Sequence, residues 1–268
     1  MPVDPGTGLT ILGGAIGSAK LVEKVLGPTA DYLGSGMKTW TENRFENVKR
    51  IFERADDLLG EDADPAHRVP PRVLRDVLDD GSFRDDELSA AYYGGILASS
   101  RTGVSRDDRG ASFTALVGRL TAYQLRAHFV LYQTVQRLFR GQVHNLGVDK
   151  DRKKCGVYIP MADYLGAMSL EPGEHPDTLL AHALFGLQTE SLIEDHFAYG
   201  GAAHLKSIYK TVAEGASGIV YCPSPLGVEL YLWAIGTQTA SINMILSSTI
   251  DVPALEIKEC TNAVPTQP

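Results

Sequence analysis

The stretch Thr121–Phe139, TAYQLRAHFVLYQTVQRLF, gives the clearest signal for how this chain folds. Thr121 and Gln124 have the spacing of a capping box, in which the two side chains each bond a backbone N–H at the start of a helix. The apolar residues of this stretch recur along one side of a helix: Ala127, Leu131, Val135 and Leu138. The sequence therefore predicts a helix that begins after Thr121, ends near Phe139 and faces inward along that side.

Downstream of this helix, short strand-like runs alternate with helix signals. The predicted strands are Gly156–Ile159, Leu192–Phe197, Lys206–Val212 and Gly218–Cys222, the last two forming a hairpin. The predicted helices are Pro160–Ser169, Pro176–Gln188 and Leu226–Ile235, the last with Ser224 as N-cap and with Leu226, Leu230 and Trp233 in the core. The order helix, strand, helix, helix, two strands, helix is that of a winged-helix domain with a small antiparallel sheet.

Upstream, the chain reads as a series of helices. The stretch Thr29–Leu59 is predicted to be largely helical. In its second part, Met37–Leu59, an apolar stripe recurs at spacings of three and four: Phe45, Val48, Phe52, Ala55 and Leu59. Asp85–Ser99 is a second helix, with Ser82 as its predicted cap. The expected fold class is mainly α (α+β). We expect a helical region over residues 1–110, a winged-helix-like domain over 111–250 and a disordered tail over 251–268, where the periodicity ends.

Composition excludes several classes of protein. Of 268 residues, 44% are apolar and 22% are charged, so the chain can bury a core and is not disordered as a whole. The net charge is −8. Residues 111–268 hold 11 Lys and Arg against 14 Asp and Glu, a net charge of −3. A strongly basic nucleic-acid-binding protein is therefore disfavoured.

The cysteines and the hydropathy pattern indicate a cytoplasmic protein. Cys155, Cys222 and Cys260 are far apart and form no C-x-x-C motif, which is typical of a reducing compartment. No apolar run reaches the length of about 18 residues that a membrane-spanning helix needs. The start of the chain has no basic region of the kind that begins a secretion signal.

Four collinear segments resemble the abortive-infection alpha family of bacterial anti-phage proteins. They are GPTADYLGSGMKTWTENRFENVKRIF (Gly27–Phe52), GSFRDDELSAAYYGGILASSRT (Gly81–Thr102), FTALVGRLTAYQLRAHFVLY (Phe113–Tyr132) and SPLGVELYLWAIG (Ser224–Gly236). The resemblance implies antiviral defence, with phage resistance achieved by halting the growth of infected cells. It implies no catalytic residue. The chain departs from the family pattern in the long stretch Ala198–Ser217.

A charged cluster flanks the predicted helix Asp85–Ser99. Its members are Arg84, Asp85, Asp86, Arg106, Asp107, Asp108 and Arg109. Such carboxylates could form a metal site or an acid–base pair, as in a toxin enzyme. They could equally cap helices and cross-link loops, since acidic residues are favourable at helix N-termini. We favour the second interpretation.

Other signatures of catalysis or of cofactor binding are not seen in the sequence. The histidines have no metal-ligand spacing, and no phosphate-binding loop or dinucleotide fingerprint occurs. Cys155 and Cys222 lie in apolar surroundings, which favours inert thiols. The sequence therefore predicts no metal, no cofactor and no catalytic residue, and it favours a protein that is not an enzyme.

The helix predicted over Leu9–Leu26 contains several small residues, with Gly13 and Gly17 forming a G-x-x-x-G motif that permits close helix approach. Ordinary packing, self-association into a homo-oligomer, and contact with a membrane surface are alternatives for this interaction helix. Contact through residues 9–26 would place the protein at the periphery of the inner membrane. Deleting residues 1–26 is expected to leave the rest folded.

DNA recognition is not expected from the winged-helix-like domain. The candidate recognition helix Pro176–Gln188 contains no Lys or Arg, although base reading uses mainly Arg, Lys, Asn and Gln. A basic loop carries Lys150, Arg152, Lys153 and Lys154, but Asp149 and Asp151 cancel half of that charge. The apolar side of the helix suits packing within the domain or a protein partner; it consists of Leu179, Leu180, Leu184, Phe185 and Leu187.

Three functions remain as alternatives. The first is a non-enzymatic phage-defence protein that acts through interaction with a host or phage protein or with a membrane surface. The second is a winged-helix transcriptional regulator that binds DNA. The third is a toxin enzyme that uses the charged cluster.

Overall fold

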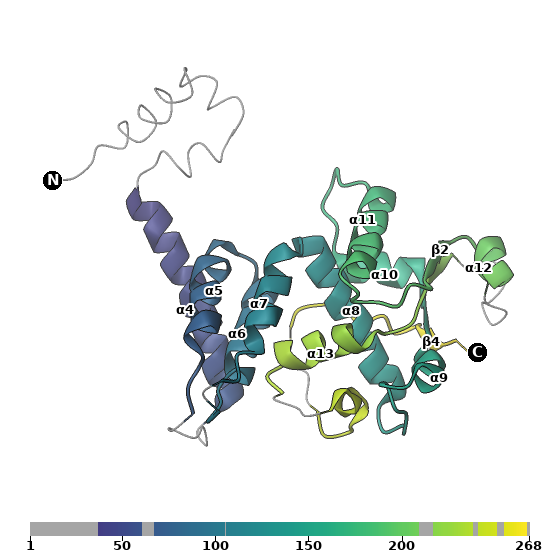
Figure 1. Ribbon diagram of the computed structural model, residues 1–268. Helices are drawn as coiled ribbons and strands as arrows, with labels where there is room; N and C mark the ends of the chain where they lie inside the picture. The colour runs from purple at the N-terminus through teal and green to yellow at the C-terminus, as the bar shows by residue number, and fades with distance from the viewer. Residues whose placement is uncertain are drawn as a thin grey trace.

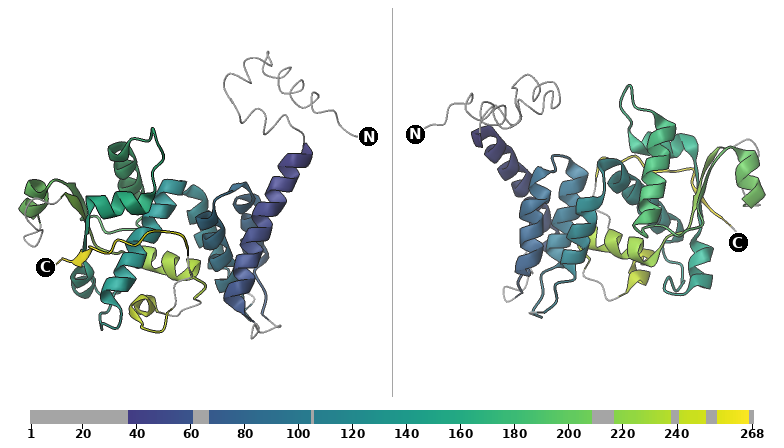
Figure 2. Two further views of the ribbon diagram at one scale, coloured as in Figure 1. Left: turned by 180° about the vertical axis from the view of Figure 1, so that it is seen from behind. Right: turned by 45° about the horizontal axis from the view of Figure 1, so that its top comes forward.

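The computed structural model describes residues 37–60, 67–104, 106–208, 217–237, 241–250 and 255–266. It is mainly helical with one small antiparallel sheet, as the sequence predicts. Figure 1 shows the first helices packed at one end of the molecule and the sheet at the other, and both views in Figure 2 show the same separation. Among these described residues, no helix combines the length and the apolar character needed to cross a membrane.

The first helices form a bundle around one buried helix. The elements are α4 (Met37–Leu59), α5 (Pro71–Asp79), the 3-10 turn η1 (Gly81–Phe83), α6 (Glu87–Ser99) and α7 (Gly110–Arg119). Every residue of α6 except Glu87 is buried. Two adjacent glycines allow this: a Cβ on Gly94 would lie 2.8 Å from the carbonyl oxygen of Ile51, and one on Gly95 would lie 1.8 Å from that of Ala234. The Gly94-Gly95 pair therefore lets helices approach α6 closely on two sides.

The buried side of α4 differs from the predicted one. Of the predicted apolar stripe only Ala55 is buried, whereas Phe45 is 70% exposed and Phe52 is 44% exposed. The side that packs on the bundle instead includes Asn47, whose Nδ2 donates to the carbonyl oxygen of Ser82 at 2.9 Å. The stripe is therefore wrong as a core face, because a polar contact to another element fixes the rotation of the helix.

The remaining elements pack around α8 (Ala122–Phe139), where the predicted capping box is confirmed. Thr121 Oγ1 accepts from the backbone of Gln124 at 3.3 Å, and the Thr121 N–H donates to Gln124 Oε1 at 2.9 Å. The later elements are α9 (Asp149–Arg152), η2 (Lys153–Cys155), β1 (Val157–Pro160), α10 (Met161–Met168), α11 (Pro176–Thr189), β2 (Ala198–Gly200), α12 (Ala202–Ile208), β3 (Gly218–Tyr221), α13 (Pro225–Ala234), η3 (Ile242–Leu246) and β4 (Val264–Pro265).

The sheet has the strand order β2-β3-β1-β4, and each neighbouring pair is antiparallel. Alternate residues face opposite sides, as a strand's geometry requires. Ile159 and Ile219 join the main core, whereas Tyr158 and Val220 form a second cluster with Leu205 of α12. Helix α12 therefore covers the outer face of the sheet.

Some of the predictions for this half are confirmed and others are wrong. Ser224 caps α13, since its Oγ accepts from the backbone N–H of Gly227 at 3.0 Å. Leu230 and Trp233 are buried, but Leu226 is 37% exposed. The strand predicted from residue 206 is wrong, because residues 206–208 belong to α12 and the strand paired with β3 is β2.

The predicted disordered tail over 251–268 is wrong for residues 255–266. Strand β4 pairs with β1, and Thr266 N–H donates to the carbonyl oxygen of Gly156 at 2.8 Å. Cys260 and Ala263 are buried in the main core. These residues are held by contacts distant in sequence, which local periodicity does not report.

One hydrophobic core runs through both halves of the molecule. Helix α7 packs against α5 and α6, so it belongs with the first helices, and the predicted boundary after residue 110 falls one helix too early. Phe113 of α7 meets Trp233 of α13 with ring centroids 4.8 Å apart. The two halves are therefore joined by buried side chains.

A buried polar chain crosses this core at His128. Tyr92 OH lies 2.5 Å from His128 Nδ1, and His128 Nε2 lies 3.0 Å from the carbonyl oxygen of Gly227. Because a carbonyl can only accept, Nε2 carries the hydrogen and Nδ1 accepts from the tyrosine. Burial lowers the pKa of His128 from 6.5 to about 3. The neutral imidazole thus links α6, α8 and α13.

Candidate functional site

The predicted charged cluster is divided between the two ends of α6. Arg84, Asp85 and Asp86 precede the helix, and residues 106–109 follow it. A helix of 13 residues is about 20 Å long. The carboxylates at the two ends of α6 are therefore too far apart to form one active site.

Arg84 stabilises the end of a neighbouring helix. Its Nη2 donates to the carbonyl oxygens of Gly118 at 3.1 Å and Leu120 at 2.9 Å. These carbonyls belong to the last turn of α7, where intrahelical partners are missing. The side chain therefore has a structural role that spans two helices.

Asp86, rather than Ser82, is the N-cap of α6. Its carboxylate accepts from the backbone N–H of Ser89 at 2.8 Å. Ser82 Oγ instead donates to the carbonyl oxygen of Asp79 at 3.1 Å. The prediction that acidic residues of the cluster cap helices is confirmed for Asp86, whereas the cap predicted at Ser82 is wrong by four positions.

The second half of the cluster cross-links its own loop. Arg109 donates to both carboxylate oxygens of Asp107, at 2.8 and 2.9 Å, and this pairing lowers the pKa of Asp107. Arg72 of α5 lies 3.5 Å from Asp108. Arg106 is exposed. These pairs tie the loop to α5 and α7.

The basic segment is a short helix and a 3-10 turn, not a loop. Lys153 pairs with Asp149 at 2.7 Å and Lys154 pairs with Asp151 at 2.6 Å. Arg152 pairs with Glu194 at 2.7 Å, and its side chain is only 11% exposed. Lys150 is exposed and has no ion pair to a described residue. Three of the four cations are thus neutralised within the protein.

The remaining predicted residues either lie outside the described part of the chain or are thiols that are wholly or partly buried. Gly13 and Gly17 lie outside the described residues. Burial raises the pKa of Cys155 to about 12 and the pKa of Cys222 to about 11, which favours the neutral thiol. Within the described ranges, no group of three or more His, Cys, Asp and Glu side chains is placed to hold a metal ion.

An aromatic cluster, formed by Phe185 of α11, Tyr199 of β2 and Phe197 directly before β2, lies on the outer side of these elements. The Phe185 ring is 5.3 Å from that of Phe197 and 6.3 Å from that of Tyr199, between centroids. Phe197 and Tyr199 stack at 6.5 Å. Phe185 is 52% exposed, so the cluster presents an apolar surface to solvent although α11 buries its other side on α8.

The surroundings of this aromatic cluster carry negative rather than positive charge. Helix α11 contains no Lys or Arg. At the edge of the cluster, Gln188 Nε2 donates to Asp195 Oδ1 at 3.4 Å. Asp195 is exposed and has no Lys or Arg partner in the described part of the chain. The exposed face is therefore aromatic, with one acidic side chain, Asp195, beside it.

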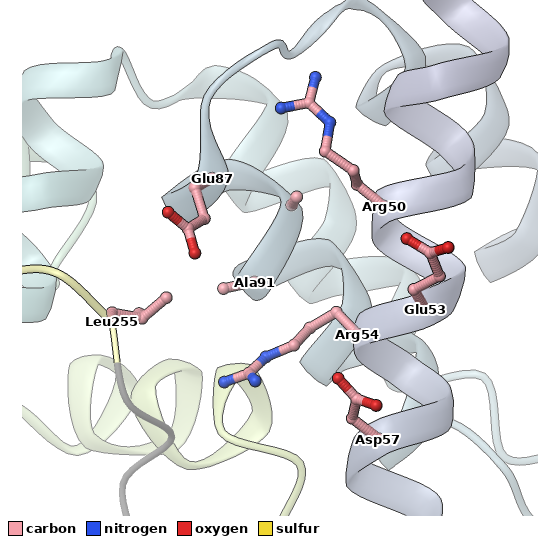
Figure 3. Close-up of a pocket in the computed structure, with 8 residues that line it drawn as sticks. Arg50, Glu53, Arg54, Asp57, Glu87, Ala91 and Leu255 are labelled. Carbon is pink, nitrogen blue, oxygen red and sulfur yellow. The ribbon is translucent and has the colours of Figure 1, made fainter.

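A pocket of about 400 Å³ lies at the other end of the molecule, between α4, α6 and the C-terminal segment. Figure 3 shows Arg54 reaching from α4 into the space below Ala91, with Glu87 above it and Leu255 on the far side. Its lining is a mixture of charged and apolar groups: Arg50, Glu53, Arg54, Asp57, Glu87, Ala90, Ala91 and Leu255. This volume is in the range of small-molecule sites.

The sequence predicts Phe185 on an apolar helix side, but it does not predict the other residues of either site. Phe197 and Tyr199 lie beyond α11, and only the sheet brings them beside it. Arg50 and Arg54 are four residues apart on one helix, a signal that sequence could have supplied. The wall formed by Leu255 comes from the predicted disordered tail.

No family model matches the chain, and no curated protein sequence or solved structure matches it significantly.

Proposed function

We propose that this protein acts by binding another protein, through the aromatic cluster of α11 and β2, and that its biological role is phage defence by abortive infection. The defence role rests on the four segments that resemble the abortive-infection alpha family. The binding role rests on one structural observation, an exposed aromatic cluster on a helix that has no cation.

The proposal includes a winged-helix-like arrangement for the second half of the chain. The order α8, β1, α10, α11, β2, β3 and the pairing of β3 between β1 and β2 support it. In this arrangement α11 is the recognition helix, and the aromatic cluster occupies its outward face. The inserted α12 between β2 and β3 is an addition to the simple pattern.

The composition of this face favours a protein partner. Aromatic residues are enriched at the centres of protein interfaces, and they contribute most when a partner covers them fully. Asp195 beside the cluster favours a partner that places a Lys or Arg beside its apolar side chain. The partner chemistry is therefore a basic and apolar segment of a host or phage protein.

DNA binding is the second candidate, favoured only by the arrangement of the elements. DNA-binding helices contact phosphates and bases mainly through Arg, Lys, Asn and Gln. Helix α11 offers Gln188 alone, and that side chain already bonds Asp195. The basic segment is neutralised by its own ion pairs.

Phage challenge tests the proposal. Cells that produce the wild-type protein should show reduced phage plating against an empty-vector control, and Phe185→Ser should lose this protection. Phe45→Ser is the matched control, since Phe45 is a more exposed phenylalanine on another helix. Equal melting temperatures of the purified variants show that they are folded.

Two outcomes would contradict the proposal. If cells that produce the wild-type protein are as sensitive to phage as empty-vector cells, the protein has no role in defence. If Phe185→Ser protects as well as the wild type, the aromatic cluster is not needed for defence. Retardation of duplex DNA by the wild-type protein at about 0.15 M salt, where weak phosphate contacts are screened, would favour the DNA-binding candidate.

A further inference from the structure

The pocket between α4 and α6 contains an arginine whose side chain has no partner among the described residues. The side chain of Arg54 makes no hydrogen bond or ion pair with any of them, and its Nε is buried. A buried donor that is left unsatisfied costs about 1–3 kcal/mol, more when it is charged. Such a group calls for an explanation, and a bound acceptor is one.

The position of Arg54 is fixed by its neighbours. A Cβ on Gly94 of α6 would lie 2.7 Å from Arg54 Cβ and 2.8 Å from its Cγ. The stem of Arg54 therefore lies across Gly94, and the absence of a side chain there makes room for it. Figure 3 shows the guanidinium continuing past Ala91 towards Leu255. The planar group is thus held with its donors in the pocket.

The second arginine of the pocket is already occupied. Arg50 Nη1 donates to the carbonyl oxygen of Asp85 at 2.7 Å, and Nη2 donates to Asn47 Oδ1 at 2.5 Å. Arg54 is therefore the one unpaired cation among the described residues that line the pocket. A single arginine matches a single carboxylate, which it can bind through two parallel hydrogen bonds.

Three carboxylates also line the pocket. Glu53 pairs with Lys49 at 3.8 Å, outside the pocket. Asp57 and Glu87 form no ion pair within the described residues, and Figure 3 shows the carboxylate of Glu87 turned towards the space that Arg54 enters. Two arginines against three acidic residues disfavour a polyanion such as a phosphate. They favour a ligand that brings a positive group of its own.

We propose that this pocket binds a free amino acid, with the ligand carboxylate on Arg54 and the ligand ammonium on Glu87. Ala90, Ala91 and Leu255 provide an apolar surface for an aliphatic side chain. The inference goes beyond the proposed function, because this pocket and the aromatic cluster lie on different elements.

The test is a binding screen on the full-length protein. Each of the twenty L-amino acids is offered at roughly 5 mM in a saturation-transfer NMR experiment, which detects dissociation constants in the millimolar range. The expected result is binding of at least one aliphatic amino acid. Its carboxylate-only and amine-only analogues should bind more weakly, and inorganic phosphate should not compete.

Two variants locate the site. Arg54→Met keeps the stem over Gly94 and removes the guanidinium, so it should weaken binding by roughly tenfold or more. Glu87→Gln should reduce the preference for the amino acid over its carboxylate-only analogue. Arg75→Met is the matched control, since Arg75 is an exposed arginine on α5.

The proposal is overturned if no amino acid binds, if phosphate displaces the bound amino acid, or if Arg54→Met binds as well as Arg75→Met does. Melting temperatures separate a local from a global effect. If Arg54→Met is unfolded, the proposal is tested by competition on the wild-type protein. In that experiment the amine-only analogue and the carboxylate-only analogue must each displace the amino acid.

Discussion

Replacing His128 with glutamine should flatten the dependence of stability on pH. The wild-type imidazole is fully buried, accepts from Tyr92 and donates to the carbonyl oxygen of Gly227. Its pKa is lowered from 6.5 to about 3, mainly by burial. Glutamine can keep one donor and one acceptor, but it cannot take up a proton.

The sign of the effect follows from proton binding. Between pH 6.5 and pH 3 the unfolded chain binds a proton at His128 and the folded protein does not, so stability falls as the pH falls. Well below pH 6.5 the slope approaches about 1.4 kcal/mol per pH unit. From pH 6.5 to pH 4.5 the loss from this one group amounts to roughly 2 kcal/mol.

Urea unfolding measures this effect. The free energies of unfolding of the wild type and His128→Gln are compared at pH 6.5, 5.5 and 4.5 by circular dichroism, and other titrating groups cancel in the difference. The advantage of the wild type should shrink by roughly 2 kcal/mol over that range. A difference that stays constant with pH would refute the buried neutral imidazole. An NMR titration of the wild-type ring is the second check, with no protonation expected above pH 4.5.

Three further changes test the packing. Trp233→Ala should lower the free energy of unfolding by about 3–5 kcal/mol in urea titrations, because a buried indole is lost from the junction of the two halves. Gly95→Ala should lower the melting temperature strongly, since its Cβ would lie 1.8 Å from a carbonyl oxygen of α13, and an unchanged value would contradict that contact. Deleting residues 255–268 should expose the core to a hydrophobic dye, and an unchanged dye signal and melting temperature would contradict the role of β4.

Signals contained within a few residues predicted the helices well. Thr121 with Gln124, and Ser224 before Pro225, fixed two helix starts that the structure confirms. A cap acts between residues three apart, so its whole physical cause is visible in the sequence. Of the helix predicted over Thr29–Leu59, the part Met37–Leu59 is confirmed, and residues 29–36 lie outside the described residues.

Features that depend on distant contacts were not predictable in this way. The rotation of α4 depends on Asn47 bonding Ser82 and on Gly94 meeting the helix. Residues 255–266 are ordered because Cys260 enters the core and β4 pairs with β1. The charged cluster looked like one group in sequence, but Arg84 serves the end of another helix.

The candidate sites also combine features that local sequence predicts with features that depend on distant contacts. Phe185 was predicted to lie on an apolar helix side, but its exposure depends on how α11 sits on α8, and its aromatic neighbours come from another element. The amino-acid pocket needs Arg54 from one helix, Glu87 from another and Leu255 from a segment that local periodicity assigns to a disordered tail. Neither site is contiguous in sequence.

Phage plating on cells that produce Phe185→Arg is the sharpest test of protein binding through the aromatic cluster. An arginine at the centre of the exposed aromatic cluster would repel a basic and apolar protein partner, whereas on a DNA-binding helix it would add a favourable phosphate contact. Protection should fall to the level of the empty vector while the melting temperature stays within a few degrees of the wild type. Protection equal to or greater than that of the wild type would contradict binding of a protein partner through this cluster.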